Sequence, residues 1–159
     1  VPSPRPERPE ADPADVRSIE AIVEASYEAF SGPGEDSPDW ERFRSLFLPG
    51  ASLVKANHAA EGGPHTHMGA VEEYIETDGR YVETLDFREE AVHMVTERYG
   101  DIAQAFVTYE GRSPSGAAEP TFRGLGSFQL WHDGDRWWIV NMMWQGEREG
   151  APIPERYQK

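Results

Sequence analysis

The most continuous hydrophobic pattern lies near the C-terminal end of the chain. Two apolar runs, residues 122–131 and 137–145, flank the short segment His-Asp-Gly-Asp. An Asp-Gly loop between apolar runs predicts a β-hairpin, and the aromatic and β-branched residues of both runs favour strands. Between residues 137 and 144 the only polar break is Asn141, which is typical of a strand buried on both faces. We therefore expect this hairpin in the middle of the fold, covered by other elements.

Helical spacing dominates the first third of the chain. Asp12 followed by Pro13 predicts a helix start, and apolar residues then recur every three or four positions as far as Phe30. Gly-Pro-Gly at positions 32–34 ends this helix. A second, shorter helix is predicted from Pro38 to the Pro-Gly pair at positions 49–50. A third is predicted over residues 71–78, with glutamates along one side.

Strand patterns fill most of the remaining chain. We expect a strand over residues 51–57, a brief return strand over 66–68, and two long strands over 90–99 and 102–112 before the hairpin. The order is two helices, a short hairpin, a helix and then a four-stranded antiparallel meander. Helices segregated to one side of an antiparallel sheet predict an α+β domain.

Two segments carry a resemblance to a known family. These are FRSLFLPGASL at positions 43–53 and DGDRWWIVNMMW at positions 133–144. Together with the element order, they resemble the nuclear transport factor 2-like superfamily over residues 15–147. That superfamily includes ketosteroid isomerase and the SnoaL-type polyketide cyclases. The resemblance implies a cone-shaped, curved antiparallel sheet wrapped around the N-terminal helices, with an internal pocket. Members include enzymes, binding modules and subunits without chemistry, so the resemblance is specific for fold and not for function.

Composition divides the chain into three parts. Residues 1–12 are rich in proline and charge, which predicts a disordered tether, and residues 13–147 form the single predicted cone-fold domain. Residues 148–159 are polar and interrupted by proline, so we expect a loosely packed tail. A start at valine before a Pro-rich segment is typical of a removed signal peptide, which predicts a periplasmic or extracellular protein. The alternative is an artificial start of a cytoplasmic chain.

Charge and cysteine content exclude several partners and chemistries. The formal net charge is −14, and so acidic a chain repels phosphate backbones and anionic lipids. No apolar run approaches the length that spans a bilayer. The chain contains no cysteine, which removes thiol catalysis and thiolate metal sites. We therefore expect neither a nucleic-acid partner nor membrane insertion, and no motif predicts a cofactor.

The resemblance also implies where a catalytic group would lie. Enzymes of the superfamily place an Asp, His or Tyr in the cone to move a proton beside a carbonyl. The strand predicted over residues 102–112 offers no acid before Glu110, so no catalytic Asp is carried over. His58, at the end of the first strand, and Tyr109 remain as proton carriers, although a single histidine without a motif is more often a surface residue.

Histidine spacing raises the alternative of a zinc site. His65 and His67 are two residues apart and would point to the same side of a strand, and His58 would complete a three-nitrogen set. The intervening loop is glycine-rich and no acidic fourth ligand is tied to it by spacing, so we predict no metal. The glutamates at positions 72, 73, 76, 89 and 90 are expected on solvated faces.

A small-molecule pocket is usually apolar with a few polar groups. The residues we expect to line it are His58, Tyr74, Tyr109, Arg123, Asn141, Met143 and Gln145. The predicted function is binding of a small, mostly apolar molecule. One alternative is a cyclase, isomerase or dehydratase that uses His58 or Tyr109 for proton transfer. A second alternative is a non-catalytic accessory protein whose pocket is filled by its own side chains.

Alternation along the last strand predicts which residues share a face. It places Trp137, Ile139, Asn141, Met143 and Gln145 on one face and Trp138, Val140, Met142 and Trp144 on the other. We assign the face with the two amides to the pocket, although one bulge would reverse the assignment. The opposite face still carries large apolar side chains, and no helix remains to cover it. An exposed patch of this kind predicts a homodimer through the sheet.

Overall fold

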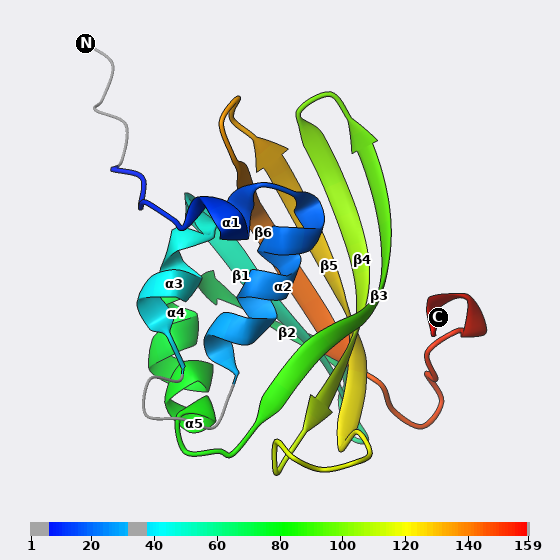
Figure 1. The fold of residues 1–159 in the computed structure, drawn as a ribbon. Coiled ribbons are helices and arrows are strands. Elements are labelled where there is room, and N and C mark those ends of the chain that lie inside the picture. Colours follow the sequence, from blue (N-terminus) through cyan, green and yellow to red (C-terminus); the bar gives the residue numbers. More distant parts are fainter. Residues whose placement is uncertain (1–6, 32–37, 159) are drawn as a thin grey trace.

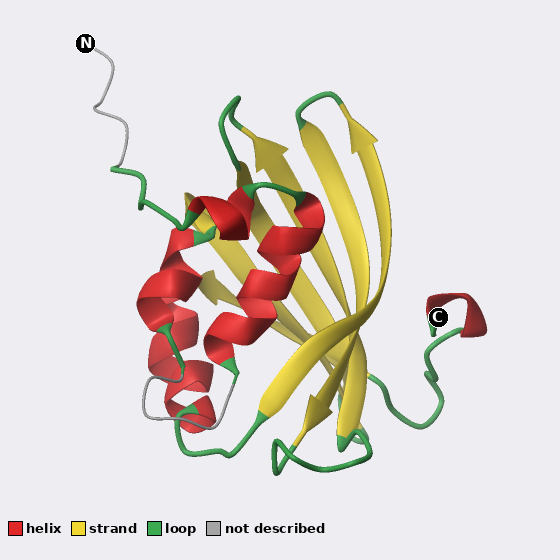
Figure 2. Ribbon diagram, in the orientation of Figure 1, coloured by secondary structure: helices red, strands yellow, loops and turns green. Residues whose placement is uncertain are grey.

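Helices and strands occupy separate layers in the computed structural model, which describes residues 7–31 and 38–158 (Figure 1). Figure 2 shows the helices gathered on one side of a twisted sheet, while the C-terminal segment lies on the other side. This arrangement confirms the α+β class and the position of the N-terminal helices relative to the sheet.

The helical layer contains short pieces. They are α1 (Pro13–Val16), α2 (Ile19–Phe30), α3 (Trp40–Ser45), α4 (Val71–Tyr74), the π-helical turn η1 (Ile75–Gly79) and α5 (Arg80–Val82). The helix predicted from Pro13 to Phe30 is broken at Ser18, whose backbone is extended and whose side chain accepts a hydrogen bond from the Ala21 amide at 3.0 Å. Ser18 therefore caps α2, because a side-chain oxygen there satisfies a free amide of the first turn.

The sheet has six strands in the order β2-β1-β6-β5-β4-β3. Their bounds are β1 (Phe47–Ala59), β2 (Gly63–Ala70), β3 (Arg88–Tyr99), β4 (Ile102–Arg112), β5 (Phe122–His132) and β6 (Trp137–Gly146). The predicted hairpin, β5–β6, is central, as its apolar pattern indicated. Neighbouring strands are antiparallel except β1 and β6, which run parallel, so the sheet is mixed rather than wholly antiparallel. It does not close into a barrel.

The hydrophobic core lies between the helices and one face of the sheet, which we call the inner face. Its most buried large side chains include Tyr27 and Phe43 from the helices and Val107, Phe128 and Ile139 from the strands. Apolar burial of this kind supplies most of the driving force for folding. It also determines which side chains of each strand face the helices.

A β-bulge in β6 changes the predicted alternation. Ile139 pairs with Leu130 and Asn141 pairs with Gln129, so one extra residue, Val140, lies between two consecutive partners. An extra residue reverses the side chains beyond it. Trp137 and Ile139 face the core as predicted, but after the bulge the inward residues are Met142 and Trp144. The inward assignment of Asn141, Met143 and Gln145 is therefore wrong, and these three belong to the opposite face, the outer face.

Both ends of the described chain contact the domain. In the segment that we expected to be a tether, Arg8 lies over the Trp131 and Trp138 rings, and the carbonyl of Pro9 accepts a hydrogen bond from Arg136. In the segment that we expected to pack loosely, Ile153 is buried and the carbonyl of Tyr157 accepts a hydrogen bond from Thr108 on the outer face. Residues 1–6 of the predicted tether lie outside the described residues.

Candidate functional site

A partly enclosed cavity of about 140 Å³ lies between the helices and the inner face. Most of the side chains that line it are aromatic. The lining residues are Tyr27, Phe30, Phe43, Leu53, Tyr74, Glu89, Tyr109, Phe122, Met142 and Trp144. An apolar space with a few polar groups is the usual form of a small-molecule site.

Aromatic contacts fix the walls of this cavity. The Tyr74 ring stacks on Phe43 with centroids 5.6 Å apart and meets the edge of Trp144 at 5.8 Å. The Tyr27 ring lies 6.0 Å from the Tyr109 ring. These separations are within the range in which aromatic pairs attract one another. The walls are therefore held by contacts between α2, α3, α4, β4 and β6.

Two glycines of β5 make room for tyrosine hydroxyls. A β-carbon at Gly124 would overlap the Tyr109 hydroxyl, and a β-carbon at Gly126 would lie 3.1 Å from the Tyr27 hydroxyl oxygen. A side chain at Gly124 would displace the Tyr109 ring, whereas one at Gly126 would require a shift of only a few tenths of an ångström. Gly124 is therefore the position where the site depends on glycine, because glycine in a strand interior permits close approach.

Glu89 is the one carboxylate in the cavity wall. It lies near the start of β3, where its amide donates to Ser31 Oγ at 2.9 Å and its carbonyl oxygen accepts from the same hydroxyl at 3.3 Å. Ser31 ends α2, so these two bonds hold the strand against the helix. Burial raises the pKa of the Glu89 carboxyl to about 8, because a charge in a poorly solvated site is unfavourable. Among the described residues no cation pairs with it.

The tyrosine hydroxyls around Glu89 are also kept neutral. Burial, and then the nearby Glu89 carboxylate, raises the pKa of Tyr27, Tyr74 and Tyr109 above the ordinary tyrosine value. The Tyr27 hydroxyl is fully buried and has no hydrogen-bond partner among the described residues. An unpaired buried polar group costs stability, so each such group calls for an explanation.

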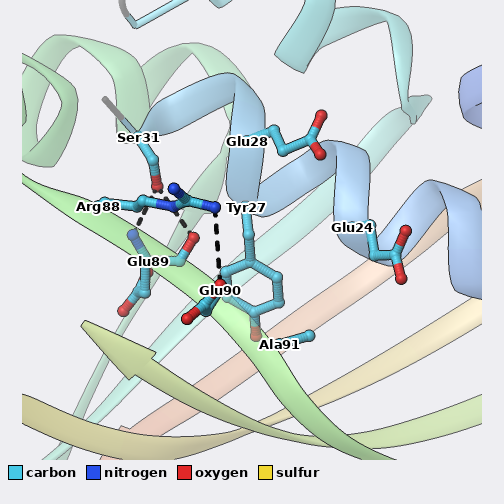
Figure 3. A pocket seen from close by; sticks show the side chains of 8 residues that line it. All are labelled: Glu24, Tyr27, Glu28, Ser31, Arg88, Glu89, Glu90 and Ala91. Carbon is cyan, nitrogen blue, oxygen red and sulfur yellow. Dashed lines mark hydrogen bonds and ion pairs between the residues drawn. The ribbon is translucent and has the colours of Figure 1, made fainter. Parts of the chain in front are cut away.

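A second hollow, of about 450 Å³, opens to solvent between α2 and β3. Figure 3 shows its wall: Glu24, Tyr27, Glu28 and Ser31 project from the helix, and residues 88–91 come from the strand that crosses it. We call this hollow the vestibule. Tyr27 and Glu89 line both the vestibule and the cavity, so these two residues lie where the two spaces adjoin.

Two of the predicted ligand-binding residues do line the cavity. Tyr74 and Tyr109 come together there from α4 and β4, which is the position that the resemblance implied for polar groups. Whether they bind a ligand stays a prediction. The apolar neighbour Met142 takes the place that we had assigned to Met143.

Three predicted residues of β6 instead serve the outer face. The Asn141 side chain donates to Ser52 Oγ at 2.8 Å and to the Ser52 carbonyl at 3.2 Å, which ties β6 to β1. Met143 and Gln145 lie beside Ile153 of the C-terminal segment. The bulge at Val140 is the physical reason for all three placements.

Arg123 and His58 also lie away from the cavity. The Arg123 guanidinium pairs with Glu147 through two hydrogen bonds of 3.0 Å, and His58 is an exposed residue of β1. Arg123 is turned from the cavity because its neighbours Phe122 and Gly124 take the inward positions of β5. His58 is therefore unsuited to carry a proton inside the cavity.

The three histidines of the zinc alternative do not converge. His65 and His67 point to one side of β2, opposite Asn57 and Lys55, whereas His58 points to the other side. His67 pairs with Glu73 at 3.2 Å. Within residues 7–31 and 38–158, no group of three acidic or histidine side chains is arranged to hold a metal ion.

Sequence reasoning missed Glu89 and Tyr27. We expected Glu89 and Glu90 on a solvated face because their spacing did not indicate an acid pair or a metal site, whereas β3 begins at Arg88 and includes both. The neighbours of Glu89 two positions away, Phe87 and Ala91, are apolar and pack on the core, and this alternation was the available signal. Tyr27 belonged to the apolar stripe of its helix, where nothing marks one hydroxyl as unpaired.

Comparison with known proteins agrees with the fold. No family model and no curated protein matches the chain. Solved structures with the NTF2-like or cystatin-like α+β fold do match it, which confirms the fold that the sequence resemblance implied. Several of these proteins are described as having no known function.

Three of these structures illustrate how low the sequence identity is despite the similar fold. A protein with a cystatin-like fold from Caulobacter vibrioides has a TM-score of 0.60 at 19% identity, covering 85% of this chain and 91% of its own. An NTF2-like protein from Pseudomonas putida has a TM-score of 0.60 at 15% identity, with 89% of each chain covered. A protein with a cystatin-like fold from Nostoc punctiforme has a TM-score of 0.59 at 10% identity, covering 82% of this chain and 93% of its own. At these identities the likeness establishes the fold alone.

Proposed function

We propose that this chain binds a small, mostly apolar molecule in the internal cavity. One observation carries the proposal: a partly enclosed space of about 140 Å³ is walled by aromatic rings and is lined by a half-buried carboxyl and by a tyrosine hydroxyl that has no partner among the described residues. A cavity of roughly 150 Å³ lined only by apolar side chains accommodates benzene, so a molecule with one six-membered ring and one polar substituent matches this space. The polar substituent would contact Glu89 and the tyrosine hydroxyls.

Adjacent methionines of β6 provide a matched test. Met142 lines the cavity and Met143 is on the outer face. Met142→Phe should fill the cavity and abolish binding of benzyl alcohol, whereas Met143→Phe should leave it unchanged. Chemical-shift titration by NMR measures both. Absence of binding to the wild type at millimolar benzyl alcohol, or equal binding by both variants, would reject the proposal. Native mass spectrometry of the purified protein would reveal a ligand that it already carries.

A proton-transfer enzyme is the second candidate, and the pKa of Glu89 favours it. A carboxyl with a pKa of about 8 changes its charge near neutral pH, as a general base requires. Glu89 would then take the role that we assigned to His58, with Tyr109 as a hydrogen-bond donor. Direct titration of the Glu89 carboxyl by carbon-detected NMR tests this candidate, and a pKa near the ordinary glutamate value would remove its support.

We also propose that the chain forms a homodimer through the outer face. Its support is the half of that face beside the β3–β4 turn, where Tyr99 is 85% and Ile102 is 60% exposed and Trp131 and Val140 lie next to them. Tyr99→Ser with Ile102→Ser should therefore produce a monomer. Light scattering at high micromolar concentration decides: a wild type that is already monomeric contradicts the proposal.

Among the described residues, no helix is both long and apolar enough to cross a membrane.

A further inference from the structure

The vestibule and the cavity differ in charge but share two residues. The vestibule wall carries four carboxylates and one guanidinium, namely Glu24, Glu28, Glu89, Glu90 and Arg88. The cavity beyond it is aromatic, with Glu89 as its one charged group. A molecule that passes from solvent to the cavity between Tyr27 and Glu89 therefore meets negative charge first and aromatic rings second.

Most of the vestibule charges are already paired. Glu28 bonds to Arg42 at 2.8 Å, and Glu90 pairs with Arg112 at 3.2 Å. Glu90 also pairs with Arg88 at 3.7 Å (Figure 3). Within the part of the chain that the structure describes, Glu24 and Glu89 have no cationic partner. Glu24 is exposed and solvated, whereas Glu89 is held against the cavity.

A buried carboxylate is stable as an ion only with a counter-charge. No lysine or arginine occupies positions 32–37, which follow Ser31 in the chain, so the adjoining loop supplies no cation from its own sequence. The Tyr27 hydroxyl, which is buried and has no partner among the described residues, lines the same cavity. A ligand with a positively charged group that carries N–H donors supplies the counter-charge that Glu89 lacks.

On this basis, and resting on the proposed function of the cavity, we infer that the ligand is a small organic amine whose ammonium group pairs with Glu89 and whose apolar body fills the aromatic cavity. The ammonium group donates to the Glu89 carboxylate. The rings of Tyr27, Tyr109 and Tyr74 add the attraction of aromatic faces for a cation. The vestibule carboxylates raise the local concentration of cations, which speeds association.

The affinity for the amine should also depend on pH. Without ligand, the Glu89 carboxyl has a pKa of about 8, so binding an ammonium ion near neutral pH must release a proton from Glu89. Affinity for the amine therefore rises as pH increases from about 6 to about 8, whereas affinity for a neutral analogue does not. The groups that face Glu89 are Tyr27, Glu24 and Glu28 on α2, Arg88 and Glu90 on β3, Tyr109 on β4 and Tyr74 on α4.

Benzylamine and benzyl alcohol are suitable probes because they have nearly the same shape and differ in charge. We expect the wild type at about pH 8 to bind benzylamine about tenfold more tightly than benzyl alcohol. Glu89→Gln should reduce this ratio to about one while still binding the alcohol. Glu20→Gln, which removes an exposed carboxylate of α2 outside the vestibule wall, is the control of equal charge and should keep the ratio. Isothermal titration calorimetry measures all three proteins.

Three results overturn the inference. The first is a wild type that binds both probes equally, which leaves the proposed cavity function intact. The second is loss of the preference for benzylamine in about 0.5 M salt. Salt of that concentration screens exposed charges, so such a loss would assign the preference to exposed carboxylates and not to Glu89. The third is an equal loss of preference in Glu20→Gln. Binding of neither probe by the wild type is a different result, since it rejects the proposed function itself.

Discussion

The inner and outer faces of the sheet are both apolar, but they are covered in different ways. The inner face is closed by α2, α3 and α4, and its cavity retains one carboxyl. The outer face is divided. The C-terminal segment packs on one half, where Ile153 is buried and the Tyr157 ring lies 5.0 Å from Phe106, and the half around Tyr99 and Ile102 is open. Helices thus enclose a space, whereas an extended segment only covers a surface.

The largest effect should come from truncating the inner face. Phe128 is fully buried beneath the helices, so Phe128→Ala should lower the free energy of unfolding by roughly 3–5 kcal/mol. Tyr99→Ala removes an aromatic ring of similar size from the open half of the outer face and should cost under about 0.5 kcal/mol. Denaturant melts at a concentration where the protein is monomeric measure both. Similar losses in the two variants would mean that the outer face is as well packed as the inner face.

The covered half of the outer face should respond almost as strongly. Ile153 is 4% exposed, and Ile153→Ala should cost about 2–4 kcal/mol because it leaves a gap beneath the segment. Ile102→Ala makes the same chemical change on the open half and is the control. If both variants melt with the wild type, the C-terminal segment does not contribute to stability.

The buried carboxyl should give the inner face a pH dependence that the outer face lacks. The folded protein holds the Glu89 proton up to about pH 8, while the unfolded chain releases it near pH 4.3. The folded state therefore binds more protons between these values, and the free energy of unfolding falls as pH rises through this range. We expect a loss of roughly 2 kcal/mol in the wild type that is absent in Glu89→Gln, since residual solvent contact reduces the effect of the shift.

Glu24→Gln is the control for this pH dependence, because it neutralises an exposed carboxylate of the same vestibule. It should keep the pH slope of the wild type. Unfolding followed at about pH 5 and at about pH 8.5 gives the comparison. A slope in Glu89→Gln as steep as that of the wild type would assign the effect to another group.

The smallest effect concerns the bond that joins β6 to β1 on the outer face. Asn141→Leu leaves Ser52 without its partner and should cost about 1 kcal/mol. Gln145→Leu removes another amide further along β6 and should leave the free energy of unfolding nearly unchanged. Melts of both variants separate the cases, and binding of benzyl alcohol should be unchanged in each. Altered binding of benzyl alcohol in Asn141→Leu would show that this residue contributes to the binding site.

The prediction from sequence succeeded where hydrophobic periodicity alone determines structure. The central hairpin, the long strands β3 and β4 and the helical layer all follow from apolar spacing. The face assignment of β6 failed after Ile139, because a single extra residue at Val140 reverses every later side chain and leaves the composition unchanged. The break at Ser18 was missed because one capping hydroxyl interrupts an otherwise continuous apolar stripe.

The candidate site was only half predictable for a related reason. Tyr74 and Tyr109 were identified because polar groups on apolar elements attract attention in a sequence. Glu89 was not, because its burial depends on where β3 begins and on the contact of that strand with Ser31 at the end of α2. Such tertiary contacts decide whether a glutamate is solvated or enclosed, and the local sequence is the same in both cases.

The bulge in β3 at Val92 resembles the one in β6 but has a different consequence. β3 and β2 are the two edges of the open sheet, and an edge strand can pair with a strand of another molecule and begin aggregation. The bulge interrupts the regular row of amides and carbonyls along β3, and Pro64 removes one amide donor from β2. Each edge strand therefore carries one irregularity of the kind that limits pairing with a strand of another molecule.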